Sequence, residues 1–103
     1  MTTKFPPVHP GQTLERQFFQ PLNLSREQLA HDLHLPSYQL QDLVEGKEKI
    51  TPEIAYRLSC YFQIEPEVFL NLQQRYELEV WKDRQEINIK RQVKPYQQTL
   101  RTK

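Results

Sequence analysis

The segment from residue 24 to residue 46 constrains the fold more than any other part of this 103-residue chain. It holds two short stretches in which apolar side chains recur three and four residues apart, as on one face of an α-helix. Ser25 precedes the first stretch, and Pro36 separates the two, because proline lacks a backbone N–H and restricts the residue before it. Gly46 ends the second stretch, where a residue free to take positive φ commonly terminates a helix. The segment therefore predicts a helix-turn-helix, two short helices joined by a tight turn.

The ends and inner faces of both helices follow from the same residues. Ser25 and Gln28 predict a capping box, in which each side chain pairs with the backbone N–H of the other. Ser37 is predicted to cap the second helix through its hydroxyl. The residues expected to face inward are Leu29, Ala30 and Leu33 in the first helix, and Leu40, Leu43 and Val44 in the second.

Polar side chains at the start of the second helix suggest contact with DNA. In a helix-turn-helix the second helix enters the major groove, where glutamine can bind adenine with two hydrogen bonds. Lysines just beyond that helix would lie near phosphates. Asp42 and Glu45 oppose this reading, because carboxylates close to phosphates are repelled. A purely structural helical hairpin is the alternative. The predicted base-reading residues are Ser37, Tyr38, Gln39 and Gln41, and the predicted backbone contacts are Lys47 and Lys49.

Prolines divide the rest of the chain into further helical segments. We expect one helix over about 11–20, and another that Thr51 caps with Pro52 in the favoured first position. A long helix is predicted from Pro66 to about Glu86, and no strand-like alternation precedes residue 87. Asn23 and His34 follow helix ends, where we expect the left-handed conformation that both tolerate. Further inward-facing residues are predicted to be Leu14, Phe18, Phe19, Ile54, Ala55, Leu58, Tyr61 and Phe62.

The predicted long helix carries more apolar surface than one face can bury. One stripe should pack on the domain, and a second stripe should stay exposed in a monomer, as is typical of interfaces. A two-fold dimer is the commonest way to cover such a stripe, and the alternative is a helix that folds back on the core. The inner stripe is Val68, Phe69, Leu72, Tyr76 and Val80, and the predicted dimer interface is Leu70, Leu78 and Trp81.

Charge divides the chain into an acidic body and a basic tail. Residues 23–65 hold four Lys/Arg against seven Asp/Glu, whereas residues 87–103 hold five Lys/Arg and no acid. The tail is expected either to contact nucleic acid or an acidic partner, or to be solvated. Its evenly spaced Ile87, Ile89 and Val93 would also suit a short strand against a partner. The expected organisation is an N-terminal arm over 1–8, a helical domain over 9–86 and a tail over 87–103.

Several classes of function lack support in the sequence. The single cysteine, Cys60, excludes an intramolecular disulfide and suits a reducing cytoplasm. No apolar run approaches the roughly 20 residues that cross a bilayer, and the first residues hold no apolar stretch, so we expect no secretory signal. Two glycines leave no phosphate-binding loop, and no zinc-site spacing follows His31 and His34. We therefore expect a cytoplasmic protein that is not an enzyme and has no metal or cofactor.

Stretches along residues 9–81 resemble HigA-type antitoxins, small proteins of the Xre helix-turn-helix class. The combination is more specific than a helix-turn-helix alone. The matching stretches are His9-Pro10-Gly11 leading into Leu14, Pro21-Leu22, Leu24-Ser25, Gly46-Lys47, Ile50-Thr51, Pro66-Glu67, Phe69-Leu70-Asn71-Leu72-Gln73 and Tyr76-Glu77-Leu78-Glu79.

The resemblance implies an all-α, five-helix fold of the Xre or lambda-repressor-like type with an extended basic C-terminal tail. It also implies a dimer that represses its own operon at a palindromic operator and neutralises a HigB-type toxin. Such a toxin is a small ribonuclease of the RelE class that cuts mRNA at the ribosome. By position, Arg26 would hold a phosphate or reach a base. One departure is Glu45, because the family usually has asparagine before the glycine.

Two other functions remain open at this stage. One is a free-standing helix-turn-helix regulator without a toxin, and the other is a protein-interaction module that has lost DNA readout. If a toxin exists, its RNA-binding surface should be basic, so we expect the acidic body and not the tail to contact it. The acidic residues of that expected surface are Glu27, Asp32, Glu48 and Glu53.

Overall fold

The computed structural model describes residues 6–96, which form five α-helices and no strand. This confirms the predicted all-α fold. Residues 1–5 and 97–103, which belong to the predicted arm and tail, lie outside the described residues. The helices are α1 (Pro10–Leu14), α2 (Arg26–Leu33), α3 (Ser37–Val44), α4 (Pro52–Phe62) and α5 (Pro66–Gln92), and α1 continues into the turns η1 (Glu15–Phe19) and η2 (Gln20–Leu22).

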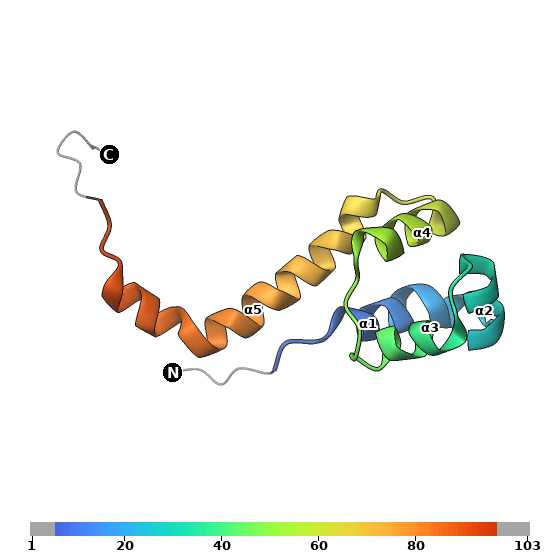
Figure 1. Cartoon of the computed structure of the whole chain (residues 1–103), viewed down its shortest axis with the longest axis horizontal. Helices are drawn as coiled ribbons and strands as arrows, with labels where there is room; N and C mark the ends of the chain where they lie inside the picture. The colour runs from blue at the N-terminus through green and yellow to red at the C-terminus, as the bar shows by residue number, and fades with distance from the viewer. Residues whose placement is uncertain (1–5, 97–103) are drawn as a thin grey trace.

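Four short helices and the start of α5 form a compact body, from which the rest of α5 projects as an arm (Figure 1). The closest packing joins α4 to α5, α2 to α3, and α1 to α3, with further contacts from α2 to α4 and from α1 to α5. The arm makes the molecule elongated, with extents of 59 × 30 × 21 Å. No helix among the described residues is long and apolar enough to cross a membrane.

The core lies where α1 to α4 meet the first turns of α5. Apart from Val68, the residues predicted to face inward are buried or half-buried, which confirms the helical periodicity. Phe18, Phe62 and Phe69 join the core through aromatic contacts, with ring centroids 5.3 Å apart for Phe18–Phe62 and for Phe18–Phe69. The buried apolar residues are Leu14, Phe19, Leu29, Ala30, Leu33, Leu35, Leu40, Leu43, Ile50, Ile54, Ala55, Leu58 and Phe69.

The first helical segment is irregular, and this has a packing consequence. After α1 the chain widens into the π-helical turn η1, in which each bond spans five residues. Leu14 and Phe19 are five residues apart, so this turn brings both onto the buried face. Pro21 has no N–H to continue the pattern, and the segment ends in a 3₁₀ turn at Asn23. The sequence predicted one plain helix here.

The predicted helix starts are confirmed at two of three sites. The Ser25 hydroxyl accepts from the Gln28 backbone N–H at 3.0 Å, and the Thr51 hydroxyl accepts from that of Ile54 at 3.2 Å. The reciprocal half of the capping box is wrong, because the Gln28 side chain donates to Asp32 instead. The predicted Ser37 cap is also wrong. Pro36 occupies the capping position without a side-chain bond, and Ser37 is already inside α3.

Left-handed residues end three of the helical segments. Asn23 and His34 have φ of 59° and 57°, as predicted, and Gln63 adopts the same conformation after α4. Gly46 follows α3 with φ of 83°, which confirms its role as the terminator of that helix. These turns fix the angles at which α2, α3 and α5 leave their predecessors.

The helix α5 differs from its prediction in length and in its faces. It runs to Gln92, so residues 87–92 are helical and the expected division at residue 87 falls inside a helix. Leu70 is half-buried and packs against the core, which removes it from the predicted outer stripe. Val68, expected to face inward, is instead 43% exposed. The side of α5 that packs against the core thus includes Leu70 and not Val68.

Candidate nucleic-acid interface

The first turn of α3 presents polar side chains to solvent. Ser37 and Tyr38 are exposed, and the Tyr38 ring leaves 70% of its surface accessible. Gln41 is exposed one turn later, while Gln39 is half-buried. Leu40 and Leu43 anchor the opposite face of α3 in the core, so the polar face has a fixed orientation. This arrangement fits a helix inserted into a DNA groove.

Glu45 brings three of the predicted DNA-contacting residues together. Its carboxylate accepts a hydrogen bond from the Gln41 amide at 2.8 Å and lies 3.2 Å from the Lys47 ammonium. These two bonds, and the nearby charge of Arg26, lower the pKa of Glu45. The Glu45 carboxylate therefore binds the Gln41 amide and the Lys47 ammonium, which are the groups predicted to contact bases and phosphates.

Every other predicted cation of the interface is also paired with an acid. The Arg26 guanidinium lies 3.5 Å from Glu15, and the Lys49 ammonium lies 3.6 Å from Glu77. The Gln39 amide donates to Glu48 at 3.1 Å. Only the Gln41–Glu45 pair, four residues apart on one helix, had a sequence signal. The partners Glu15, Glu48 and Glu77 come from other segments, and sequence reasoning missed them.

The loop that carries both lysines is fixed by α5. The buried backbone N–H of Ile50 donates to Oε1 of Gln73 at 2.8 Å. Gln73 is the buried polar side chain of the described core, at 6% exposure, and its amide nitrogen donates to Glu77 at 3.1 Å. Gln73 ends one of the stretches that carry the resemblance, but its burial was not predicted, because a lone glutamine on a helix carries no pattern that marks it as buried.

Gly11 and His9 fix the start of α1 against α3. A Cβ on Gly11 would collide with the carbonyl group of Leu43, so only glycine allows this approach. The His9 ring caps α1 by accepting from the Gly11 N–H through Nδ1 at 2.9 Å. The segment His9-Pro10-Gly11, which carries part of the resemblance, thus packs against the C-terminal half of α3.

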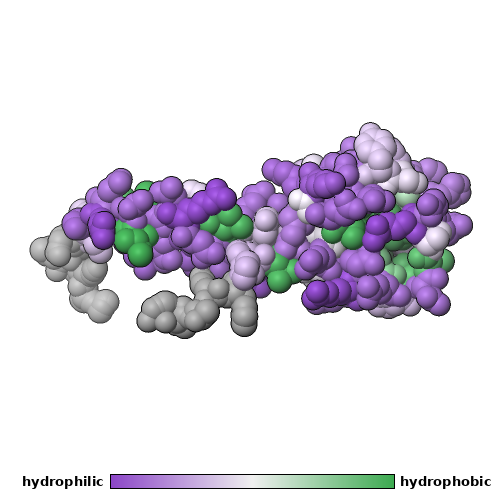
Figure 2. Space-filling view, turned by 90° about the horizontal axis from the view of Figure 1, so that it is seen from below, coloured by the Kyte–Doolittle hydropathy of each residue, from purple (hydrophilic) through white to green (hydrophobic). Residues whose placement is uncertain are grey.

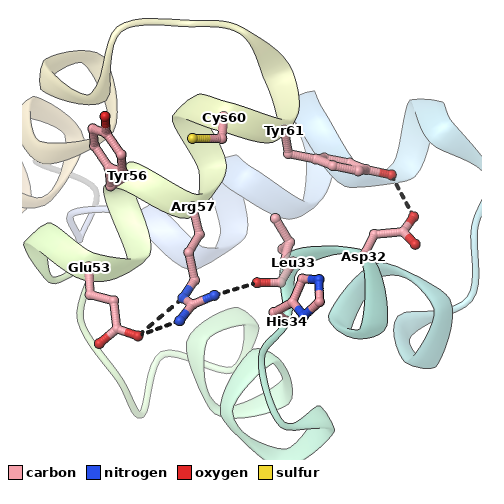
Figure 3. A pocket seen from close by; sticks show the side chains of 8 residues that line it. All are labelled: Asp32, Leu33, His34, Glu53, Tyr56, Arg57, Cys60 and Tyr61. Atoms are coloured by element: carbon pink, nitrogen blue, oxygen red, sulfur yellow. Dashed lines mark hydrogen bonds and ion pairs between the residues drawn. The ribbon is translucent and has the colours of Figure 1, made fainter.

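A groove of about 580 Å³ lies between the end of α2 and α4 (Figure 3), and no residue of α3 lines it. The Arg57 guanidinium donates to the Leu33 carbonyl at 3.1 Å and to Glu53 at 3.0 and 3.1 Å. The Tyr61 hydroxyl donates to Asp32 at 2.9 Å. This bond lowers the pKa of Asp32 and raises that of Tyr61. The lining residues are Asp32, Leu33, His34, Glu53, Tyr56, Arg57, Cys60 and Tyr61.

A second groove runs along the outer face of α5. Leu78 and Trp81 line it and are about half-exposed, and Val68 takes the place predicted for Leu70. Figure 2 shows apolar patches that interrupt the polar surface along this arm. Ile87 and Ile89 are exposed further along the helix. The arm therefore carries apolar surface that the body does not cover.

Metal-ligating residues do not gather within residues 6–96, where no group of three or more His, Cys, Asp or Glu could hold an ion. His31 and His34 stack with ring centroids 6.4 Å apart. Cys60 is exposed on α4.

The fold and the exposed face of α3 define a helix-turn-helix domain of the Xre class. No family model matches the chain. Virulence-associated protein I of Dichelobacter nodosus is 34% identical over 87 residues, which cover 84% of this chain and 81% of that protein. An addiction module antidote protein of the HigA family from Coxiella burnetii is 32% identical, with a TM-score of 0.82 over 89% of this chain and all of that one. The Pseudomonas aeruginosa antitoxin HigA, solved with the higBA promoter, is 27% identical, with a TM-score of 0.82 over 88% and 99% of the two chains. The chain belongs to the HigA-type family of helix-turn-helix antitoxins.

Proposed function

We propose that this chain is a DNA-binding antitoxin that represses its own operon. The observation that carries the proposal is the exposed polar face of α3, held rigidly on a fold that matches an antitoxin solved with its promoter. Ser37, Tyr38, Gln39 and Gln41 would read base edges, while Arg26, Lys47 and Lys49 would contact the backbone. Five of these side chains are paired with a carboxylate of the protein, and DNA would have to replace that carboxylate at each of them. They are Arg26, Gln39, Gln41, Lys47 and Lys49.

A homodimer would place two copies of α3 on a palindromic operator. The groove on α5 supports this, because Leu78 and Trp81 expose apolar surface on a helix that extends well past the body. A two-fold pairing along α5 would cover this surface and would set the spacing between the two reading helices.

We place the toxin on the groove between α2 and α4. Asp32 and Glu53 carry negative charge at its wall, and hydrogen bonds fix the neighbouring Tyr61 and Arg57 side chains. Arg57 offsets one of the two acids, which leaves the groove with one net negative charge. A groove of that charge with the exposed Tyr56 ring suits a basic protein surface, such as that of a HigB-type ribonuclease. The exposed side chains of α3 lie outside this groove, so DNA and toxin would bind together.

The DNA-binding proposal is tested by replacing the reading residues. Gln39→Ala and Gln41→Ala should relax preference at particular bases, with about 1–3 kcal/mol lost per bidentate contact. Lys47→Ala should weaken binding to all sequences about equally. Loss of affinity without loss of base preference in the glutamine variants would contradict the assignment.

The toxin proposal is tested by pull-down with the neighbouring toxin protein. Asp32→Asn with Tyr56→Ala should weaken the complex and leave DNA binding unchanged. Removal of the residues after Gln92 should leave the complex intact, because α5 stays whole. Loss of the complex on that truncation would place the toxin-binding element in the tail.

The carboxylate pairs favour a second candidate, a protein-interaction module without DNA readout. Arg26, Gln39, Gln41, Lys47 and Lys49 all contact acids of their own chain. Toxin binding by the wild-type protein, with equal affinity for its upstream DNA and for scrambled DNA, would identify this candidate.

A further inference from the structure

Two residues of α5, Gln73 and Glu77, connect the long helix to the loop that follows α3. They lie one helical turn apart, and the Gln73 amide nitrogen donates to Oε2 of Glu77 at 3.1 Å. The same Glu77 oxygen lies 3.6 Å from the Lys49 ammonium. Gln73 accepts from the Ile50 N–H at 2.8 Å. One helix thus contacts two successive residues of the loop, one through its backbone and one through its side chain.

The two contacts differ in strength. Ile50 is 2% exposed and its bond to Gln73 is buried, so loss of the acceptor would leave a buried N–H without a partner. The Lys49–Glu77 pair is solvated, with side chains 64% and 52% exposed, and such pairs contribute little. The backbone contact therefore fixes the loop, whereas the ion pair can open at low cost.

We propose that Gln73 positions the DNA-contacting loop, and that Glu77 lowers DNA affinity by competing with phosphate for Lys49. This inference rests on the proposed DNA binding, and it assigns part of the DNA affinity to two residues of α5, outside the helix-turn-helix itself. Gln73 acts through Ile50, which directly follows Lys49 and precedes the Thr51 cap of α4. The loop between α3 and α4 is therefore held at its C-terminal end by α5.

Glu77 also lines the outer groove of α5 together with Leu78 and Trp81. Any partner that covers this groove would lie close to the Glu77 carboxylate, which pairs with Lys49. In a dimer built on α5, the subunit interface and the DNA-binding loop would therefore share Glu77. Dimer formation and DNA affinity are then coupled through this residue.

The two substitutions have opposite predicted effects on DNA affinity. Gln73→Leu should reduce affinity for the DNA upstream of its own gene by on the order of tenfold, because the free loop would rearrange to pair the Ile50 N–H and DNA binding would have to reverse that rearrangement. Glu77→Gln keeps an acceptor for the Gln73 amide but removes the negative charge that pairs with Lys49. It should raise affinity by about two- to fivefold, the size of an exposed ion pair. A residue needed only for folding would not raise affinity when replaced.

Three controls make the result specific. Hydrogen exchange at the Ile50 amide should accelerate in Gln73→Leu and stay unchanged in Gln92→Leu, the same substitution at an exposed position of α5. In a Lys49→Ala background, Glu77→Gln should have no effect, because the two residues act as a pair. If Gln73→Leu does not fold, the Glu77 and Lys49 cycle still tests the competition, since it uses exposed side chains only.

Two results would overturn the inference. One is an unchanged or lower affinity in Glu77→Gln, and the other is an increase that persists without Lys49. If the wild-type protein binds upstream and scrambled DNA with equal affinity, the proposed base readout by α3 is wrong. The Ile50 exchange rate and the affinity for scrambled DNA would still decide whether Gln73 and Glu77 act on the loop.

Discussion

The ring of Tyr76 on α5 meets the ring of His9 edge-on, with centroids 4.9 Å apart and planes inclined by 64°. The same His9 ring caps α1 and lies against Gly46, where a Cβ would be 3.5 Å from its Cγ atom. His9 therefore joins the start of α1, the end of α3 and the middle of α5. Burial lowers the pKa of His9 below its ordinary value of 6.5.

This contact predicts a loss of stability in mild acid. The unfolded chain takes up a proton on His9 as the pH falls through 6.5, whereas the folded state resists it until a lower pH. The free energy of unfolding should therefore fall across that interval, because the Nδ1 atom that accepts from Gly11 must stay unprotonated. Urea unfolding at pH 7.5 and 5.0 should show a smaller change in His9→Asn, a cap that does not titrate. An equal change in both proteins would show that other groups cause the effect.

The two glycines give a matched pair of substitutions. Gly11→Ala should destabilise the fold by about 1–3 kcal/mol or more, because its methyl group would collide with the Leu43 carbonyl. Gly46→Ala would make only ordinary van der Waals contact with the His9 ring and should cost only the roughly 1–2 kcal/mol of a left-handed residue. Chemical denaturation measures both values. A smaller loss for Gly11→Ala than for Gly46→Ala would mean that α1 and α3 are further apart.

Glu45→Gln should strengthen DNA binding. The substitution removes the charge that holds Lys47 and leaves the Gln41 amide a weaker, neutral acceptor, and it removes a carboxylate that phosphates would repel. We expect a gain of about two- to tenfold in affinity at low salt, in line with one or two exposed ion pairs. Glu53→Gln, which also loses an ion pair but on α4, is the control and should leave affinity unchanged. Weaker binding in Glu45→Gln would show that the carboxylate itself reads a base.

Charged substitutions test whether the outer face of α5 forms the dimer interface. Leu78→Glu with Trp81→Glu should convert a dimer to monomers, because both side chains line the exposed groove. Leu70→Ala should lower stability by about 2 kcal/mol or more without changing the sedimentation of the folded protein, since Leu70 packs on the core. Ile87→Glu, on the distal arm, is the control. Dimers that persist in the double variant would move the interface elsewhere.

Local patterns predicted the helices well, because caps, prolines and apolar spacing act within a few residues. Ser25, Thr51 and Gly46 all do what their types favour at helix ends. The exchange between Leu70 and Val68 was not predictable, because it depends on how α5 crosses α4.

The candidate site was predictable in its exposed residues and not in their partners. Tyr38 and Gln41 are exposed on α3, as the helical period requires. The bonds of Gln39 to Glu48 and of Lys49 to Glu77 join segments whose meeting is set by the tertiary fold. The buried role of Gln73 has the same origin.

The central claim is that α3 reads DNA, and a salt titration with the DNA upstream of its own gene tests it most directly. We expect tighter binding to this DNA than to a scrambled duplex, with affinity for both falling steeply as salt rises. The preference between the two duplexes should shrink in the Gln39→Ala, Gln41→Ala double variant, while the salt dependence should stay. Equal affinity of the wild-type protein for the two duplexes across the titration would contradict the account.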